Sequence, residues 1–245
     1  RPQREAEELA AMLTPLGLQA VVQPAFDYVA LEAREEDPET CAELEAATAT
    51  DLVVFTSPRA VTHGLAQLSR EQLLQLRLAA IGPATASAMT ASGLRVDVAA
   101  PGGFTSEALL ATLAAEVDSS PSRPGRAFIL AAPGGRQALL EGLIALGWAA
   151  RMLLVYRSEP AALDRATLAA LDEADGVLSI WTSGNAMNAL SQRMPPAAWF
   201  RLCQGEWLVI SERLKRLARA YGPSRIHMAS GPGNGAILSA IRNLL

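Results

Sequence analysis

Short apolar runs alternate with longer stretches of helical periodicity along the whole chain. The clearest example opens at Asp51–Ser57, where an apolar run ends in Thr and Ser and a helix-like segment continues to Leu68. The next apolar run, Leu78–Ile81, passes into Gly82 and a helix that stops at Gly93. Strands that lead directly into helices are typical of parallel sheets. The pattern therefore predicts an α/β protein with mostly parallel sheets.

The rest of the chain continues this alternation. Further strands are predicted at Leu18–Gln23, Phe26–Ala30, Val96–Ala99, Ala127–Ala131, Met152–Tyr156, Gly176–Trp181, Trp207–Ile210 and Arg225–Met228. Further helices are predicted before Gly17 and Gly147, at Cys41–Ala49, from Ser106, at Leu163–Leu171, up to Leu190, from Ser211 to Gly222, and at Ala236–Leu244. The charged segment Glu32–Thr40 contains Pro38 and is predicted to be a linker or an exposed turn.

Matching features recur at a nearly constant offset of about 130 positions, which indicates an internal duplication. Gly82 and Ser211 occupy equivalent strand–helix junctions, and Gly93 and Gly222 end equivalent helices. The second copy opens with the strand Ala127–Ala131, for which the first copy has no counterpart. We therefore expect a short piece, with a strand and an initiator Met, to precede the present N-terminus.

The repeated strand–helix junctions are candidate anion sites. The first N–H groups of a helix lack internal partners and carry partial positive charge. Open parallel sheets bind ligands at the carboxyl ends of their strands, where such helices begin. Ser57 and Gly82 stand at N-cap positions, and Pro83 suits a first helical turn. That these residues only cap helices and shape turns remains an open alternative.

Composition narrows the function classes. Half of the 245 residues are apolar, enough to bury the core of one large domain or two ordinary ones. The net charge of −4 and the lack of a basic stripe argue against a nucleic-acid partner. No apolar run is long enough for a membrane span. Cys41 and Cys203 are isolated, and His63 and His227 lie far apart, which predicts a reduced, cytoplasmic protein without a metal.

Several short motifs together resemble one known family. They are Arg1-Pro2 before a helix, Phe55-Thr-Ser57, Ile81-Gly82-x-x-Thr85-Ala86 before Gly93, Gly135-Arg136 before a Leu-rich helix, Leu154-Val-Tyr156-Arg157, and Val209-Ile-Ser211-Glu212-Arg213. In their order and spacing they resemble the uroporphyrinogen-III synthase family. The resemblance covers nearly the whole chain.

The resemblance implies a specific architecture. The family has two flavodoxin-like α/β lobes with mostly parallel sheets, joined by a two-stranded linker. Mapped onto this sequence, lobe one holds residues 1–27 plus 160–245 and is discontinuous, and lobe two holds residues 36–152. Residues 28–35 and 153–159 form the linkers. This arrangement replaces the tandem division near residue 125 that the repeat alone favours.

The resemblance also implies a reaction. Enzymes of this family are lyases that cyclise hydroxymethylbilane, a linear tetrapyrrole, to uroporphyrinogen III on the route to heme. The terminal hydroxyl leaves as water, and ring D is inverted through a spirocyclic intermediate. No cofactor or metal takes part. For this chain, the resemblance predicts a cytoplasmic monomer whose partner is a small tetrapyrrole.

The family's functional positions map onto residues of this sequence. Tyr156 corresponds to a tyrosine that is thought to help the hydroxyl leave, although packing within the linker is an equally simple role. Arg59 and Gly184-Asn185 depart from the usual pattern. A nucleophile–base pair of Ser57 and His63 is disfavoured because no orienting acid is evident. The predicted substrate-binding residues are Arg1, Ser57, Gly82, Thr85, Arg136, Thr182, Ser183, Gly184 and Ser211.

Two other functions remain open on the sequence. A two-lobed, hinged binding protein for a small anion would share the fold and the helix N-termini but would not turn substrate over. A sugar-phosphate enzyme would need a firm phosphate loop or an acid–base pair, and neither is found. Turnover with a change in isomer ratio separates the synthase from the binding protein.

Overall fold

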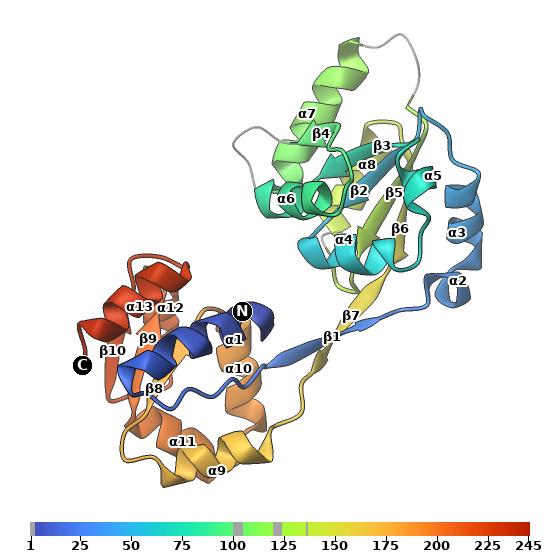
Figure 1. The fold of residues 1–245 in the computed structure, drawn as a ribbon. Coiled ribbons are helices and arrows are strands. Elements are labelled where there is room, and N and C mark those ends of the chain that lie inside the picture. The colour runs from blue at the N-terminus through green and yellow to red at the C-terminus, as the bar shows by residue number, and fades with distance from the viewer. Residues whose placement is uncertain (1–2, 100–104, 120–123, 136) are drawn as a thin grey trace. The chain divides into compact units, whose positions relative to one another are not determined.

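The computed structural model describes residues 3–99, 105–119, 124–135 and 137–245. The chain forms two compact units. The terminal unit contains residues up to Asp27 together with Glu159–Leu245, and the central unit contains Tyr28–Ser158 (Figure 1). The α/β class with mostly parallel sheets is confirmed, because the strand pairs within both units are parallel.

The central unit is built on a five-stranded parallel sheet of order β4-β3-β2-β5-β6. Its strands are β2 (Leu52–Phe55), β3 (Arg77–Ala80), β4 (Val98–Ala99), β5 (Arg126–Ala131) and β6 (Ala149–Leu154). The direction in which successive strands are added reverses between β2 and β5. Phe55 pairs with Ala80 on one side and Leu130 on the other, so these strands end at the same edge.

Helices cover both faces of this sheet. One face packs on five helices: α2 (Ala33–Glu36), α3 (Pro38–Glu45), α4 (Pro58–Leu65), α5 (Arg70–Leu73) and α6 (Pro83–Ala91). The other face packs on α7 (Ser106–Ser119) and α8 (Gln137–Ala145) (Figure 1). The apolar strand β2 and the apolar run Ala127–Ala131 of β5 follow from this arrangement, because a strand covered on both faces has no solvent side.

The terminal unit repeats this layering on a smaller sheet of order β10-β9-β8. Its strands are β8 (Leu178–Trp181), β9 (Glu206–Val209) and β10 (Arg225–Met228). One face packs on α9 (Arg165–Glu173), α10 (Gly184–Arg193), α11 (Pro196–Gln204) and α12 (Glu212–Arg219). The other face packs on α1 (Gln3–Leu13) and α13 (Asn234–Arg242), and a 3-10 turn, η1 (Thr14–Leu16), follows α1.

A two-stranded sheet of β1 (Phe26–Ala30) and β7 (Tyr156–Pro160) carries the chain from one unit to the other. The boundary between the units falls inside both strands. Backbone hydrogen bonds close the sheet at each end: Leu31 N–H donates to Val155 O at 3.2 Å, and Ala161 N–H donates to Ala25 O at 3.1 Å.

Two local predictions were wrong. Leu18–Gln23 is not a strand in the structure, although Leu18 and Ala20 pack beside the α1 and α13 cluster as alternation predicts. Side-chain burial alone does not make a strand, and this segment lacks a backbone ladder. The expected turn at Glu32–Thr40 is mostly helical, because the Asp37 carboxylate caps α3 by accepting from Thr40 N–H at 3.0 Å. No helix in the described part of the chain is long and apolar enough to cross a membrane.

Candidate active site

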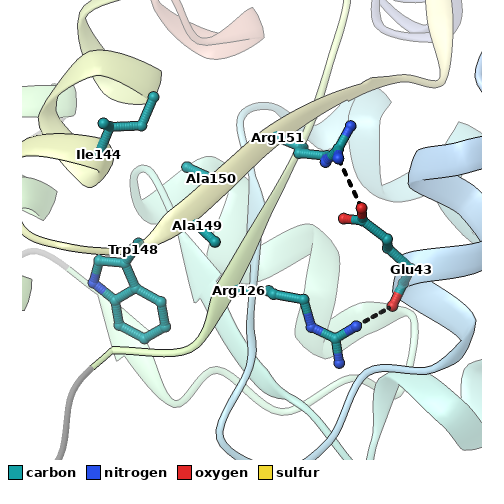
Figure 2. A pocket seen from close by; sticks show the side chains of 7 residues that line it. All are labelled: Glu43, Arg126, Ile144, Trp148, Ala149, Ala150 and Arg151. Carbon is teal, nitrogen blue, oxygen red and sulfur yellow. Dashed lines mark hydrogen bonds and ion pairs between the residues drawn. The ribbon is translucent and has the colours of Figure 1, made fainter.

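One hollow in the described part of the central unit lies at the amino ends of β5 and β6 (Figure 2). Its volume is about 530 Å³, and Trp148 and Ile144 form its apolar wall. The charges around it are already paired. Arg126 donates to the Glu43 carbonyl oxygen at 3.0 Å, and an Arg151 nitrogen lies 2.7 Å from the Glu43 carboxylate. Parallel sheets bind ligands at the opposite edge, so we do not assign the active site here.

A smaller hollow, of about 250 Å³, lies at the carboxyl edge of the same sheet, where the strand order reverses between β2 and β5. We call it the switch-point pocket. Its lining comes from the strands and the segments that follow them, from the loop after β5 and from α8: Thr56, Ser57, Ile81, Ile129, Ala131, Ala132, Pro133, Gly134, Gly135, Leu139, Met152 and Tyr156. In open α/β sheets this position is the usual ligand site.

Ser57 connects the pocket to a helix N-terminus. It is the N-cap of α4, with an extended backbone and an Oγ that accepts from Ala60 N–H at 3.0 Å. The same Oγ lies 3.1 Å from the hydroxyl oxygen of Tyr156. A serine hydroxyl has one proton and two lone pairs, so it can serve both partners at once. Ser57 therefore ties the phenol of Tyr156 to the positive end of α4.

Tyr156 reaches this place because β5 and β6 are paired. Leu154, the last residue of β6, lies beside Ala131 at the carboxyl edge of the sheet, and Tyr156 follows after one residue. The side chain is only 8% exposed. Its ring stacks on His63 with centroids 5.2 Å apart and planes at 17°, and meets Tyr28 at 6.1 Å and 59°. The phenol is thus enclosed by aromatic neighbours while its hydroxyl faces the pocket wall.

Two basic residues of α4 border this aromatic group. The guanidinium carbon of Arg59 lies 3.5 Å from the centroid of the Tyr28 ring, a cation–π contact. Burial lowers the pKa of His63 below its usual value, and the positive charge of Arg59 lowers it further. The imidazole is therefore neutral at pH 7.

Gly82 and Thr85 lie at the neighbouring strand end. Gly82 is the N-cap of α6 and has an extended backbone. Thr85 lies in the first turn of that helix with only 3% of its surface exposed. Because Phe55 pairs with Ala80, the N-termini of α4 and α6 stand side by side at the carboxyl edge.

The terminal unit contains the equivalent pair of helix N-termini. Ser183 caps α10 by accepting from Ala186 N–H at 3.4 Å, and Ser211 caps α12 by accepting from Leu214 N–H at 3.3 Å. Thr182 precedes Ser183 and is half-buried. Trp181 pairs with Val209, which brings the two caps to one edge.

Gly184 begins α10 directly after this cap. A Cβ atom there would lie 2.7 Å from a methyl of Leu217 on α12. The missing side chain therefore lets α10 approach α12 closely.

A family model described as uroporphyrinogen-III synthase HemD matches residues 7–239, which is most of the chain. The chain belongs to the uroporphyrinogen-III synthase family. The uroporphyrinogen-III synthase of Salmonella typhimurium is 34% identical over 99% of this chain and 98% of its own. That of Escherichia coli is 30% identical over the same shares.

Solved structures agree on the fold of this uroporphyrinogen-III synthase family member. A mutant uroporphyrinogen III synthase from Thermus thermophilus superposes with a TM-score of 0.57 at 19% identity, covering 99% of this chain and 96% of the other. The uroporphyrinogen-III synthetase of Helicobacter pylori superposes with a TM-score of 0.60 at 16% identity, covering 93% and 97%. At these identities the likeness supports the fold alone.

The structure brings some of the predicted residues of this uroporphyrinogen-III synthase together. Ser57 and Tyr156 meet at the switch-point pocket, and Gly82 caps the adjacent helix. Arg1 and Arg136 lie outside the described residues. The described residues contain no group of three or more metal-ligating side chains.

Sequence reasoning missed the surroundings of the phenol. Tyr28 and the stacking role of His63 were not predicted, and Arg59 was noted only as a departure from the family pattern. A signal was present, because Arg59 and His63 are four residues apart and share a helix face. Nothing local identified the two strands that this face would meet.

Proposed function

We propose that the switch-point pocket holds the reacting end of hydroxymethylbilane while this uroporphyrinogen-III synthase closes the macrocycle. The reaction releases water, inverts ring D and makes the protein a cyclising hydro-lyase of tetrapyrrole biosynthesis. The observation that supports this placement is the contact of 3.1 Å between the Tyr156 hydroxyl and Ser57 Oγ at the pocket wall. It puts a proton donor at the ligand edge of the sheet.

Tyr156 has the chemistry that the first step needs. A hydroxyl group leaves easily only when it receives a proton, and a positioned phenol can supply one. Ser57 Oγ accepts from Ala60 N–H and can donate its own proton to the phenolic oxygen. The proton of Tyr156 is then free to point at the leaving hydroxyl. After ring D is inverted, the pyrrole carbon that forms the last bond loses its proton. That proton restores the phenol of Tyr156, so the overall reaction releases only water.

The larger part of the task is positioning. The bilane closes without an enzyme to the isomer whose ring D is not inverted, so catalysis must hold one geometry against an easier path. A small pocket walled by strand ends and by the Gly134-Gly135 loop suits this role because its backbone is held by the sheet. Gly134 has a φ of 72°, a left-handed conformation that favours glycine.

The carboxylates of the substrate need hydrogen-bond donors on the protein. We propose that they come from the N-termini of α4 and α6 in the central unit and of α10 and α12 in the terminal unit. The residues proposed to bind substrate are Arg1, Ser57, Gly82, Thr85, Arg136, Thr182, Ser183, Gly184 and Ser211. The proposal also includes a cytoplasmic monomer that uses no cofactor and binds no nucleic acid, in keeping with the net charge of −4.

A coupled assay tests the proposal. Hydroxymethylbilane is generated in situ, the product is oxidised, and the type I and type III isomers are separated by chromatography. We expect mostly type III from the parent chain and a rate at least about 10-fold lower from Tyr156→Phe, since general acids contribute at least that much. Tyr221→Phe is the matched control, because Tyr221 packs in the terminal unit against Trp199 and Trp207.

Two results would count against this account. Full type III activity in a folded Tyr156→Phe variant would remove Tyr156 from the mechanism. Binding of the bilane with only type I product would favour a hinged binding protein, an alternative that the family membership does not favour.

A further inference from the structure

Three side chains at helical spacing on and just after α4 each contact the two-stranded connection between the units. Arg59 lies over the ring of Tyr28 in β1, and His63 stacks on the ring of Tyr156 in β7. Gln67 Nε2 donates at 3.1 Å to the backbone carbonyl just before Tyr156. This face of α4 therefore holds the strand that carries the proposed acid as well as the strand beside it.

Resting on the function proposed above, we infer that His63 is a positioning residue for Tyr156. A single hydrogen bond to Ser57 Oγ fixes where the phenolic oxygen lies but leaves the ring free to turn about it. The imidazole, nearly parallel to the phenol at 17°, fixes the plane of that ring. Together the two contacts keep the hydroxyl at the pocket wall while the substrate is held.

The environment of His63 fits an uncharged stacking partner. Burial first, and the charge of Arg59 second, lower the pKa of His63. Of the elements packed against α4, neither β2 nor α6 carries an ionisable side chain, and the only one in β5 is Arg126 at the far end of the strand. The two connecting strands that α4 contacts carry Asp27, Arg157 and Glu159 besides the two tyrosines. Among the described residues, Arg59 is the charged group that acts on the pKa of His63. No carboxylate among the described residues therefore raises the pKa of His63.

The contacts also argue against a proton-transfer role. In the described part of the chain, the His63 ring has no hydrogen-bond partner, while Ser57 Oγ is shared by Ala60 N–H and Tyr156. A general base must reach the proton that it takes, directly or through one water. His63 touches the face of the phenol instead, which is a geometry for orientation.

The test compares His63→Ala, which removes the stack, with His63→Phe, which keeps it. Thr62→Ala is the matched control, because Thr62 is the exposed neighbour on the same helix. The type III assay gives kcat and KM for each full-length variant, and urea unfolding confirms that each is folded. We expect His63→Ala to lower kcat about 3- to 10-fold with little change in KM, the range that an aromatic pair can account for. His63→Phe should recover most of that loss.

A double mutant separates positioning from a general structural effect. If His63 acts through the phenolic hydroxyl, His63→Ala should cost nothing further in a Tyr156→Phe background. The inference would be overturned if the two substitutions lowered kcat independently, so that the double mutant showed the product of the two single effects. A His63→Phe variant as slow as His63→Ala would overturn it as well. If Tyr156→Phe alone has no effect, the proposed function of Tyr156 has failed instead, and the inference falls with it.

A second measurement does not depend on activity. With fluorotyrosine incorporated, the three tyrosines give separate fluorine resonances, and Tyr156→Phe identifies the one of interest. The Tyr156 resonance should shift as pH falls through the pKa of His63, with a midpoint below the usual value of about 6.5. This titration should vanish in His63→Phe. A Tyr156 resonance that ignores both pH and the His63 substitutions would show that the two rings do not stack in solution.

Discussion

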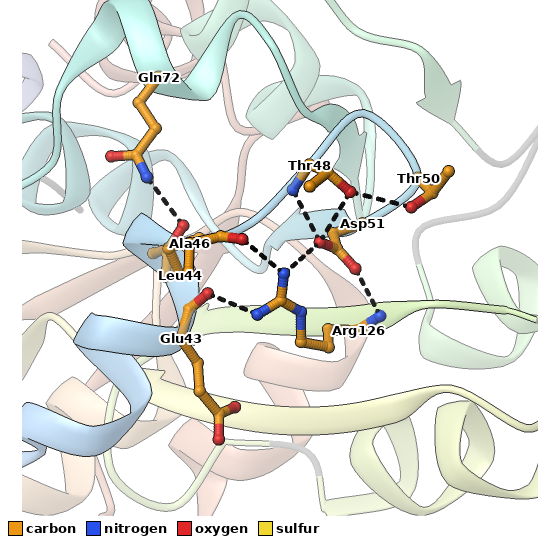
Figure 3. A network of polar contacts seen from close by, with 8 residues as sticks. All are labelled: Glu43, Leu44, Ala46, Thr48, Thr50, Asp51, Gln72 and Arg126. Atoms are coloured by element: carbon orange, nitrogen blue, oxygen red, sulfur yellow. Dashed lines mark hydrogen bonds and ion pairs between the residues drawn. The ribbon is translucent and has the colours of Figure 1, made fainter.

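Replacement of Asp51 by Asn should destabilise the central unit at the amino ends of its strands. Asp51 precedes β2, and its carboxylate is buried (Figure 3). Oδ1 accepts from Arg126 N–H at 2.7 Å, while Oδ2 accepts from Thr48 N–H and from the Arg126 guanidinium, both at 2.8 Å. These bonds join the amino ends of β2 and β5, the two strands that carry the switch-point pocket at their other ends.

The size of the expected destabilisation follows from counting hydrogen-bond acceptors. The carboxylate uses both oxygens for backbone N–H groups, but Asn has one oxygen, so one N–H must face an amide NH₂. An unmet buried N–H costs about 1–3 kcal/mol. Arg126 also loses its counter-ion, which would cost more if its side chain were not 30% exposed. We expect Asp51→Asn to lower the unfolding free energy by about 2–4 kcal/mol at pH 7.

Acidification should reduce the difference in unfolding free energy between the parent protein and the Asp51→Asn variant. Burial alone would raise the pKa of Asp51, but the hydrogen bonds from Arg126 and Thr48 outweigh it and hold the pKa below its usual value. A lowered pKa contributes stability that is complete above the unfolded value of about 3.9 and is lost as pH falls through the folded value. The parent protein and the variant should therefore become more similar in unfolding free energy below about pH 4.

Urea unfolding from pH 7 down to pH 3, followed by far-UV circular dichroism, measures the effect. Hydrogen exchange of peptides covering residues 48–55 and 124–131 localises it. The control is Glu39→Gln, whose exposed ion pair with Arg151 should be worth about 0.5 kcal/mol or less. This reasoning would be refuted if Asp51→Asn lowered the unfolding free energy at pH 7 by no more than the control does. It would also be refuted if the loss of unfolding free energy did not change with pH.

Two further substitutions follow from the same contacts. Ser57→Ala removes the N-cap of α4, so we expect the unfolding free energy, measured with urea, to fall by about 1 kcal/mol. It also removes the hydrogen-bond partner of Tyr156, so we expect slower turnover in the isomer assay. Gly125→Ala would place a Cβ 2.7 Å from Asp51 Oδ1, so about 1–3 kcal/mol should be lost. Gly176→Ala, with open space around its Cα, is the control, and equal melting temperatures for the two glycine variants would contradict the prediction.

Much of the fold could be predicted because its signals are local. An apolar run that ends in Ser and continues as a helix predicts a buried strand and an N-cap, and the N-cap predicted at Ser57 is confirmed. Ser183 and Ser211, which the sequence marked as equivalent strand–helix junctions, cap their helices as well. The α/β class and the family membership are confirmed as well. The strand predicted at Leu18–Gln23 was wrong, because a strand needs a backbone partner that the periodicity of one segment cannot supply.

The sequence by itself determined where strands give way to helices, since capping and periodicity act within a few residues. It also supplied the family, and with it the roles that Tyr156 and the substrate-binding residues still hold as predictions. Only the tertiary structure decided which residues meet. Ser57 and Tyr156 are 99 positions apart, and the contact between them exists because β2, β5 and β6 pair in parallel and end at one edge. Such contacts depend on strand order and register, which no single segment of the chain encodes.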